Sequence, residues 1–138
     1  MKIILASVSG VRKKILEKYN IATVAIASNV DEDEVKKSLL SEGADPSIIS
    51  KNLAELKSIK VSIKNPGKIV LGADSVVSLN NILINKPKSR EEAFSILKRL
   101  NGQIHYLISS VCISKNGSMI WNYTDQSKLK MKKHSDDE

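Results

Sequence analysis

The spacing of hydrophobic and polar positions predicts strands and helices that alternate through the first half of the chain. Short apolar runs at residues 2–6 and 23–27 are typical of buried strands, and apolar positions at helical spacing predict a helix over 11–19. Two more helices are expected, over 31–42 with acids in the first turn and over 46–62 beginning at a proline.

The second half of the chain is dominated by predicted strands joined by tight turns. An Asn-Pro-Gly turn precedes them, an Asn-Asn turn and an Asn-Gly turn separate them, and a Ser-x-x-Glu capping box opens one helix. The predicted elements are strands at 68–77 and 82–84, a helix at 89–101, and strands at 104–114, 119–123 and about 128–132. We therefore expect a single α/β domain over residues 1–138, with a mixed β-sheet flanked by helices.

The predicted strand at 68–77 carries the most informative polar residue of the chain. Asp74 lies among β-branched neighbours, where a buried carboxylate is costly unless it is paired, hydrogen-bonded or bound to metal. Gly72 and Ala73 leave room for another group to approach the backbone. Lys86 follows the next apolar run, so a carboxylate and a lysine on adjacent strands could form an anion and metal site. A lysine at a strand end, however, is most often just solvated.

The turn after the first predicted strand is a second candidate site. Ser7 and Ser9 lie at the N-terminus of the predicted helix and Arg12 lies in its first turn, an arrangement that can cradle a phosphate. The signal is weak alone, because any helix cap uses serine. The chain has neither a P-loop nor a Gly-x-Gly-x-x-Gly motif, which disfavours a dinucleotide-binding fold.

Other charged and reactive residues have ordinary interpretations beside the functional ones. The acids at 31–34 could supply a magnesium ligand, but such a cluster is more often a solvated helix start. Lys57, on a predicted helix, is typical of a surface lysine. The two histidines lack metal-ligand spacing, and the single cysteine, Cys112, excludes an intrachain disulfide and a cysteine-based zinc site.

Composition narrows the partners without identifying one. The chain has 22 lysine and arginine residues against 15 aspartate and glutamate residues, which gives a net charge of +7. This excess favours phosphate-bearing partners, but it is equally consistent with a basic surface that has no specific partner. Aromatic residues make up only 4% of the chain, so an interleaved aromatic and basic surface for nucleic acid is absent. No apolar run approaches transmembrane length, and we expect a reduced, cytoplasmic protein that does not associate with membranes.

Taken in order, these segments resemble the Maf family of nucleoside triphosphate pyrophosphatases along almost the whole chain. The matching segments are Leu5-Ala6-Ser7-Val8-Ser9 with Arg12 and Ile15-Leu16, Val30-Asp31-Glu32, Leu53-Ala54-Glu55-Leu56-Lys57, Gly72-Ala73-Asp74, Lys86-Pro87, and Glu92-Ala93 with Leu97, Leu100, Gly102 and His105. Each match is modest, but the ordered series is specific. The resemblance implies an architecture like that of Maf proteins and inosine triphosphatases.

The resemblance also implies an activity: hydrolysis of a nucleoside triphosphate to the monophosphate and pyrophosphate with a divalent cation, Mg²⁺ or Mn²⁺. Glu32 would help to hold the metal, and Asp74 would be the general base or a metal ligand. Phosphate contacts would fall to five residues, Ser7, Ser9, Arg12, Lys57 and Lys86. These roles agree with elementary chemistry, because cations neutralise a triphosphate and a carboxylate positions or deprotonates the attacking water.

Three departures from the family pattern bear on these expectations. Gly10-Val11 stands where the family has Pro-Arg, which removes one phosphate-binding cation. Ser75 follows Asp74 where threonine or glutamine is common, and Ser89 replaces a frequent aspartate. The preferred base is therefore open between pyrimidine and modified-base triphosphates.

Residues 135–138 form a second capping box, with no helix after it. This is either a polar, frayed tail or, as the resemblance implies, the point at which family chains continue into a helix and further strands. In the second case the domain lacks its C-terminal part, and exposed apolar edges would reduce stability or favour oligomers, a homodimer among them.

Three functional hypotheses follow. The first is a pyrophosphatase, whose activity truncation could impair. The second is a basic domain that binds nucleotide or RNA phosphate without turnover, and the third is a fragment without a function.

Overall fold

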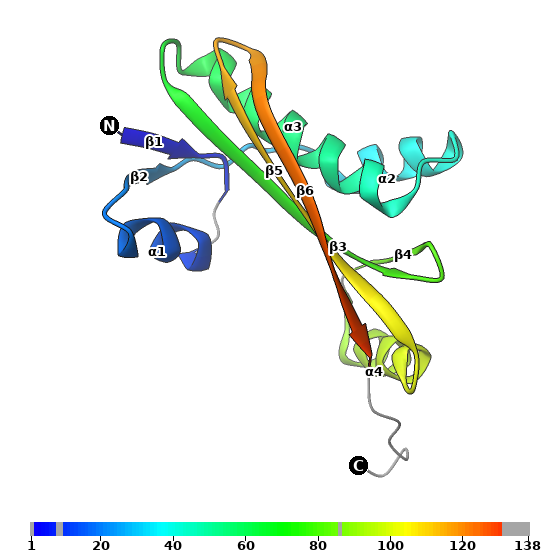
Figure 1. The fold of residues 1–138 in the computed structure, drawn as a ribbon. Helices are drawn as coiled ribbons and strands as arrows, with labels where there is room; N and C mark the ends of the chain where they lie inside the picture. The colour runs from blue at the N-terminus through cyan, green and yellow to red at the C-terminus, as the bar shows by residue number, and fades with distance from the viewer. Residues whose placement is uncertain (1, 8–9, 86, 131–138) are drawn as a thin grey trace.

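The computed structural model describes residues 2–7, 10–85 and 87–130 (Figure 1). Its elements are β1 (Lys2–Leu5), α1 (Gly10–Lys18), β2 (Ala22–Ala25), α2 (Glu32–Ser41), α3 (Pro46–Lys64), β3 (Ile69–Leu79), β4 (Ile82–Ile84), α4 (Arg90–Leu100), β5 (Ile104–Lys115) and β6 (Ser118–Lys130). The predicted α/β class, a mixed sheet flanked by helices, is confirmed. No helix in the described ranges is long and apolar enough to cross a membrane.

The long strand β3 organises the sheet, whose order is β2-β1-β3-β5-β6. β5 pairs antiparallel with one edge of β3 from Val70 to Ser78. β1 runs parallel to β3 over its start, Ile69–Leu71, and β4 pairs antiparallel with its end, Val77–Leu79. Since β5 takes one edge, β1 and β4 must share the other, and residues 72–76 have no strand partner on that edge within the described part of the chain. We call this stretch the open edge of β3.

Helix α3 lies along the sheet against β3 and β5 (Figure 1). It contacts the sheet through small side chains. Ser50, Ala54 and Ser58 on the helix are fully buried, and the hydroxyl oxygens of Ser58 and Ser114 lie 2.7 Å apart. A Cβ atom at Gly72 would lie 2.3 Å from the carbonyl oxygen of Ala54. The group predicted to approach the backbone at this glycine is therefore the backbone of α3.

Two small hydrophobic clusters lie at opposite ends of β3. Ile4, Ala6, Val61 and Val70 form the first, near β1. Leu79, Ile84 and Leu100 form the second, between β4 and α4. Figure 1 shows β1, β2 and α1 at one end of the molecule and β4 and α4 at the other, so Asp74 lies between the clusters.

Buried Cys112 agrees with its predicted place in the core. Burial of the thiol, followed by the charge of Glu55, raises its pKa to about 11. A thiol with so high a pKa carries almost no thiolate at neutral pH and is an inert packing residue.

Two sequence-based expectations need correction. The apolar face predicted for the first helix does not pack into a core, since Ile15 is 52% exposed and Tyr19, just beyond α1, is 71% exposed. The two separate strands predicted near the C-terminus are one strand, β6, which pairs with β5 along its length. Its polar middle resembles a loop, but an edge strand tolerates polar residues. Residues 131 and 132 of that prediction lie outside the described ranges.

Candidate active site

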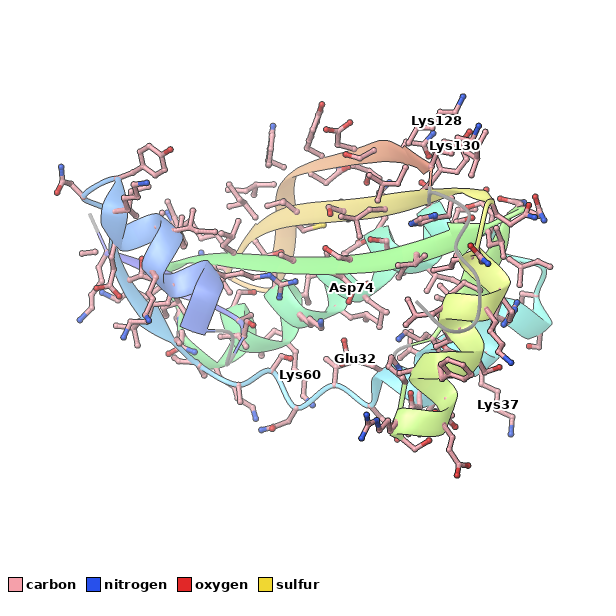
Figure 2. All side chains as sticks on the ribbon, turned by 90° about the horizontal axis from the view of Figure 1, so that it is seen from below. Glu32, Lys37, Lys60, Asp74, Lys128 and Lys130 are labelled. Carbon is pink, nitrogen blue, oxygen red and sulfur yellow. The ribbon has the colours of Figure 1, made fainter. Side chains whose placement is uncertain are left out.

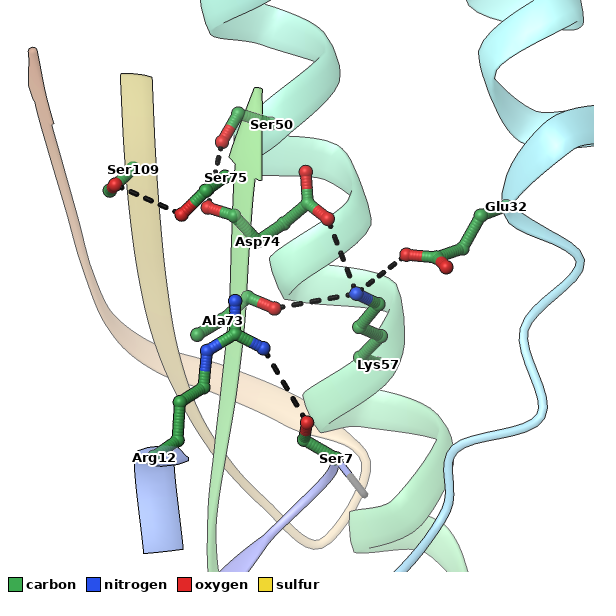
Figure 3. Close-up of polar contacts among 9 residues, drawn as sticks. All are labelled: Ser7, Arg12, Glu32, Ser50, Lys57, Ala73, Asp74, Ser75 and Ser109. Carbon is green, nitrogen blue, oxygen red and sulfur yellow. Dashed lines mark hydrogen bonds and ion pairs between the residues drawn. The ribbon is translucent and has the colours of Figure 1, made fainter. Parts of the chain in front are cut away.

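The carboxylate of Asp74 is held by a lysine from helix α3 (Figure 3). Asp74 is only 6% exposed. The Nζ atom of Lys57 donates to Asp74 Oδ1 at 3.2 Å and to the carbonyl oxygen of Ala73 at 3.4 Å, and it forms an ion pair with Glu32 Oε1 at 2.6 Å. One ammonium group therefore joins two carboxylates from different elements.

The local structure explains why these groups meet. Side chains alternate along a strand, and Val70, Gly72, Asp74 and Val76 form the buried row of β3. Because Gly72 lets α3 approach closely, the ammonium of Lys57 reaches the carboxylate two residues further along β3.

The interpretation of Lys57 as a surface lysine is wrong, because its side chain is only 12% exposed. A signal for this was present in the sequence. The buried residues Ser50, Ala54 and Val61 recur at helical spacing, and Lys57 falls on the same stripe.

The acidic cluster at the start of α2 divides into different roles. Asp31 caps the helix by accepting a hydrogen bond from the Glu34 backbone N–H at 3.2 Å, as a helix start requires. Glu32 turns toward Lys57, whereas Asp33 and Glu34 are exposed. Figure 2 shows Glu32 opposite Asp74, at the start of α2. The solvated helix start is therefore confirmed for Asp31, Asp33 and Glu34, and the magnesium ligand at Glu32 stays a prediction.

Burial dominates the electrostatics of Asp74. Desolvation raises the pKa of its carboxyl group, the charge and hydrogen bond of Lys57 lower it, and the charge of Glu32 raises it, with a net result above the ordinary value. The second carboxylate oxygen, Oδ2, is buried and accepts no hydrogen bond from the described residues. An uncompensated oxygen of this kind is typical of a functional site rather than a structural ion pair.

Ser7 and Arg12 meet beside this cluster, as the phosphate-cradle prediction requires. Arg12 Nη1 donates to Ser7 Oγ at 3.4 Å. Arg12 and Asp74 also line a common cavity of about 280 Å³. Ser9 and Lys86 lie outside the described residues, so their predicted phosphate contacts stay predictions.

The chemistry of the donors fits a divalent metal in part. Glu32 and Asp74 supply hard carboxylate oxygens near one another, and Asp74 Oδ2 has an unused acceptor position. Within the described ranges no group of three or more His, Cys, Asp or Glu side chains could hold a metal. Mg²⁺ often binds through one or two carboxylates, substrate phosphates and water, and this pair suits that arrangement.

Sequence reasoning missed two features near Asp74. Lys36 is close enough for its charge to lower the pKa of Asp74, and its spacing from Glu32, one turn along α2, was the available signal. The hydroxyls of Ser75 and Ser109 lie 3.0 Å apart across β3 and β5, and only the strand register shows this contact.

The fold and the site together define an α/β protein with a buried, lysine-paired carboxylate beside a gap in its sheet. Solved structures with this fold include a HAM1 protein from Coxiella burnetii, with a TM-score of 0.61 at 13% identity, covering 94% of this chain and 72% of that one. A protein from Mycobacterium abscessus titled nucleoside-triphosphatase / dITP/XTP pyrophosphatase has a TM-score of 0.59 at 13% identity, covering 94% of this chain and 74% of that one.

The chain belongs to the Maf family, since the profile described as Maf-like protein matches residues 2–138. A nucleoside triphosphate pyrophosphatase of Pelagibacter ubique is 65% identical over 131 residues, which are 95% of this chain and 67% of that protein. A protein of the same name from Ruegeria pomeroyi is 41% identical over 134 residues, covering 97% of this chain and 67% of its own length. The chain thus spans about two thirds of these relatives, and the resemblance stated from the sequence is confirmed.

Proposed function

We propose that this chain is a nucleoside triphosphate pyrophosphatase, which hydrolyses its substrate to a nucleoside monophosphate and pyrophosphate. The observation that carries the proposal is the buried Asp74 carboxylate, with one oxygen held by Lys57 and the other unpartnered among the described residues. A relative that is 65% identical bears the name of this activity.

Asp74 is suited to be the general base. Its Oδ1 atom is fixed by Lys57, which leaves Oδ2 to accept a proton from the attacking water. A general base works best when its pKa is close to the working pH, and burial moves the pKa of Asp74 upward in that direction. We expect the rate to rise with pH as this carboxyl group loses its proton.

Charge balance argues that the substrate enters with a metal. Glu32 and Asp74 share the single ammonium group of Lys57, so one carboxylate charge is left over where it would repel a phosphate. We propose that Glu32 holds Mg²⁺ or Mn²⁺, with Asp74 as a second ligand in the alternative in which it is not the base. The metal, when bound, would neutralise phosphate charge and favour attack by water. Arg12 and Ser7 would then bind the outer phosphates, where positive charge and a hydroxyl donor are already together.

The substitution Asp74→Asn tests the proposal. It keeps the shape of the side chain but removes the base, so we expect pyrophosphate release to fall by about 10²–10⁴-fold. The assay measures pyrophosphate released from a panel of nucleoside triphosphates, with circular dichroism to confirm folding. Asp33→Asn, an exposed neighbour of Glu32, is the matched control and should retain activity.

Unchanged release in Asp74→Asn would remove this residue from the mechanism. Salt-sensitive nucleotide binding without release in the unsubstituted chain would instead favour the domain that binds without turnover. The cytoplasmic location and the homodimer stay predictions.

A further inference from the structure

The ammonium group of Lys57 has no donor to spare in the described part of the chain. An ammonium carries three N–H donors. Lys57 Nζ lies 2.6 Å from Glu32 Oε1, 3.2 Å from Asp74 Oδ1 and 3.4 Å from the carbonyl oxygen of Ala73. Figure 3 shows the nitrogen with Glu32 on one side and β3 on the other. A phosphate oxygen that binds Lys57 must therefore displace one of these three oxygens.

Of the three acceptors, Glu32 is the one that can move aside. The Ala73 carbonyl belongs to the backbone at the open edge of β3, and the Asp74 side chain is only 8% exposed. The Glu32 side chain is 39% exposed, at the first residue of α2. Releasing Ala73 would require β3 to move, and releasing Asp74 would leave a buried charge unpaired. Releasing Glu32 requires only that an accessible side chain rotates.

Glu32 also lies between Lys57 and a cleft through which a ligand can enter. This cleft has a volume of about 570 Å³, and its walls come from α2 and from the segment that joins β4 to α4. Glu32, Lys36, Lys37 and Lys88 are among the described residues that line it, and Lys57 is not. An anion that enters the cleft thus meets the carboxylate of Glu32 before it meets the ammonium of Lys57.

We propose that Glu32 is a gate that keeps phosphate away from Lys57 until a divalent cation is present. In the metal-free chain its carboxylate occupies one donor of Lys57 and repels an approaching phosphate. When Glu32 instead binds the proposed Mg²⁺ or Mn²⁺, it releases that donor to a phosphate oxygen, while Asp74 and Ala73 keep the other two. The inference rests on the proposed function, and it makes the metal complex of a triphosphate, rather than the free triphosphate, the form that binds.

Removing the gate should create phosphate binding that needs no metal. Inorganic triphosphate is the probe, because it offers three phosphates without a base, and calorimetry measures its affinity in EDTA and in Mg²⁺. In EDTA, we expect Glu32→Ala to bind the probe at least about tenfold more tightly than the unsubstituted chain does, the effect of one hydrogen bond from a charged group. Mg²⁺ should strengthen binding by the unsubstituted chain far more than binding by Glu32→Ala.

Two controls separate the release of Lys57 from a general change of charge. Glu34→Ala is the same substitution at an exposed glutamate in the same helix turn, and it should change the affinity in EDTA by less than about twofold. In a Lys57→Met background, Glu32→Ala should also gain less than about twofold, because no ammonium remains to be released. An equal gain in either control would mean that Glu32 acts only as a repelling charge, and would overturn the gate.

Chemical labelling tests the gate without any substitution in the site. Acetic anhydride labels accessible lysine amines, and mass spectrometry compares Lys57 with Lys51, an exposed lysine on the same helix. We expect Mg²⁺ alone to speed the labelling of Lys57 and to leave that of Lys51 unchanged. Labelling of Lys57 that does not respond to Mg²⁺ would mean that Glu32 keeps its hold on the ammonium, which contradicts the proposal.

The binding measurements involve no turnover, so the gate and the hydrolase proposal can fail separately. The expected gain in Glu32→Ala, without pyrophosphate release from any nucleoside triphosphate by the unsubstituted chain, would leave the gate standing and contradict the hydrolase proposal. Pyrophosphate release by the unsubstituted chain, without a gain in Glu32→Ala, would support the hydrolase and overturn the gate.

Discussion

At the scale of single residues, Asp74 links the proposed chemistry to a cost in stability. Its carboxyl pKa in the folded chain is raised above the ordinary value of 3.8, mainly by desolvation. The folded state therefore holds the proton more tightly than the unfolded state does. Protonated Asp74 therefore stabilises the folded chain relative to the unfolded one. This contribution is fully present below pH 3.8 and is lost as the pH rises through the folded-state pKa.

We expect Asp74→Asn to melt at a higher temperature than the unsubstituted chain at pH 7, because the amide removes the cost of a buried charge. The difference should shrink toward pH 3.5, where both side chains are neutral. Each kcal/mol in the free energy of unfolding shifts the melting temperature by roughly 3–6 °C in a domain of this size. Thermal melting at both pH values would measure this, and a lower melting temperature at pH 7 would mean that the Lys57 pairing outweighs desolvation.

At the scale of elements, the contact between α3 and β3 depends on Gly72. We expect Gly72→Ala to destabilise the fold by roughly 3 kcal/mol, because its Cβ would lie 2.3 Å from the Ala54 carbonyl oxygen and 2.8 Å from the Ser58 nitrogen. Both are backbone atoms, so the helix must move, and Lys57 moves with it. Denaturant unfolding and pyrophosphate release would both register the change.

Gly67→Ala is the matched control. Gly67 has a φ of +76°, and a Cβ atom at this position would meet nothing within 4 Å, so only the backbone conformation costs energy, about 1–2 kcal/mol. The substitution should leave pyrophosphate release intact. If the two alanine variants lost stability and activity equally, close packing at Gly72 would not be what positions Lys57.

Elements with strong local signals were predictable from the sequence. The Asn-Asn turn and the capping box at Ser89 placed β4 and α4 where they are observed, Ile82–Ile84 and Arg90–Leu100. β6 was not recognised as one strand, because its polar residues are stabilised by pairing with β5 rather than by local preference. Asp74 was recognisable from its apolar neighbours, whereas the burial of Lys57 depends on which face of α3 meets the sheet.

At the scale of the whole molecule, the end of the sheet formed by β4 and α4 buries few apolar side chains. Among the described residues, the cluster at the β4 end has three buried members, Leu79, Ile84 and Leu100, and Phe94 and Leu97 on α4 are about half exposed. Regions with few buried contacts open at lower free energy than the global transition. We therefore infer that β4 and α4 open before the central strands do.

We expect Leu100→Ala to remove about 2–4 kcal/mol from this end and to speed hydrogen exchange in α4 while β3 and β5 stay protected. Val70→Ala, in the cluster near β1, should instead raise exchange in the central strands as well. Hydrogen exchange followed by mass spectrometry would compare the two variants. A uniform increase in Leu100→Ala would show that the molecule opens as one unit.

The hydroxyl-lined contact between α3 and the sheet has a thermal consequence. Ser50, Ser58 and Ser62 on the helix and Ser110 and Ser114 on β5 are buried where most proteins place larger apolar side chains. Exposing polar surface lowers the heat capacity of unfolding, whereas exposing apolar surface raises it. The stability of this chain should therefore vary more gently with temperature than that of a leucine-packed domain of equal size, and it should weaken less in the cold.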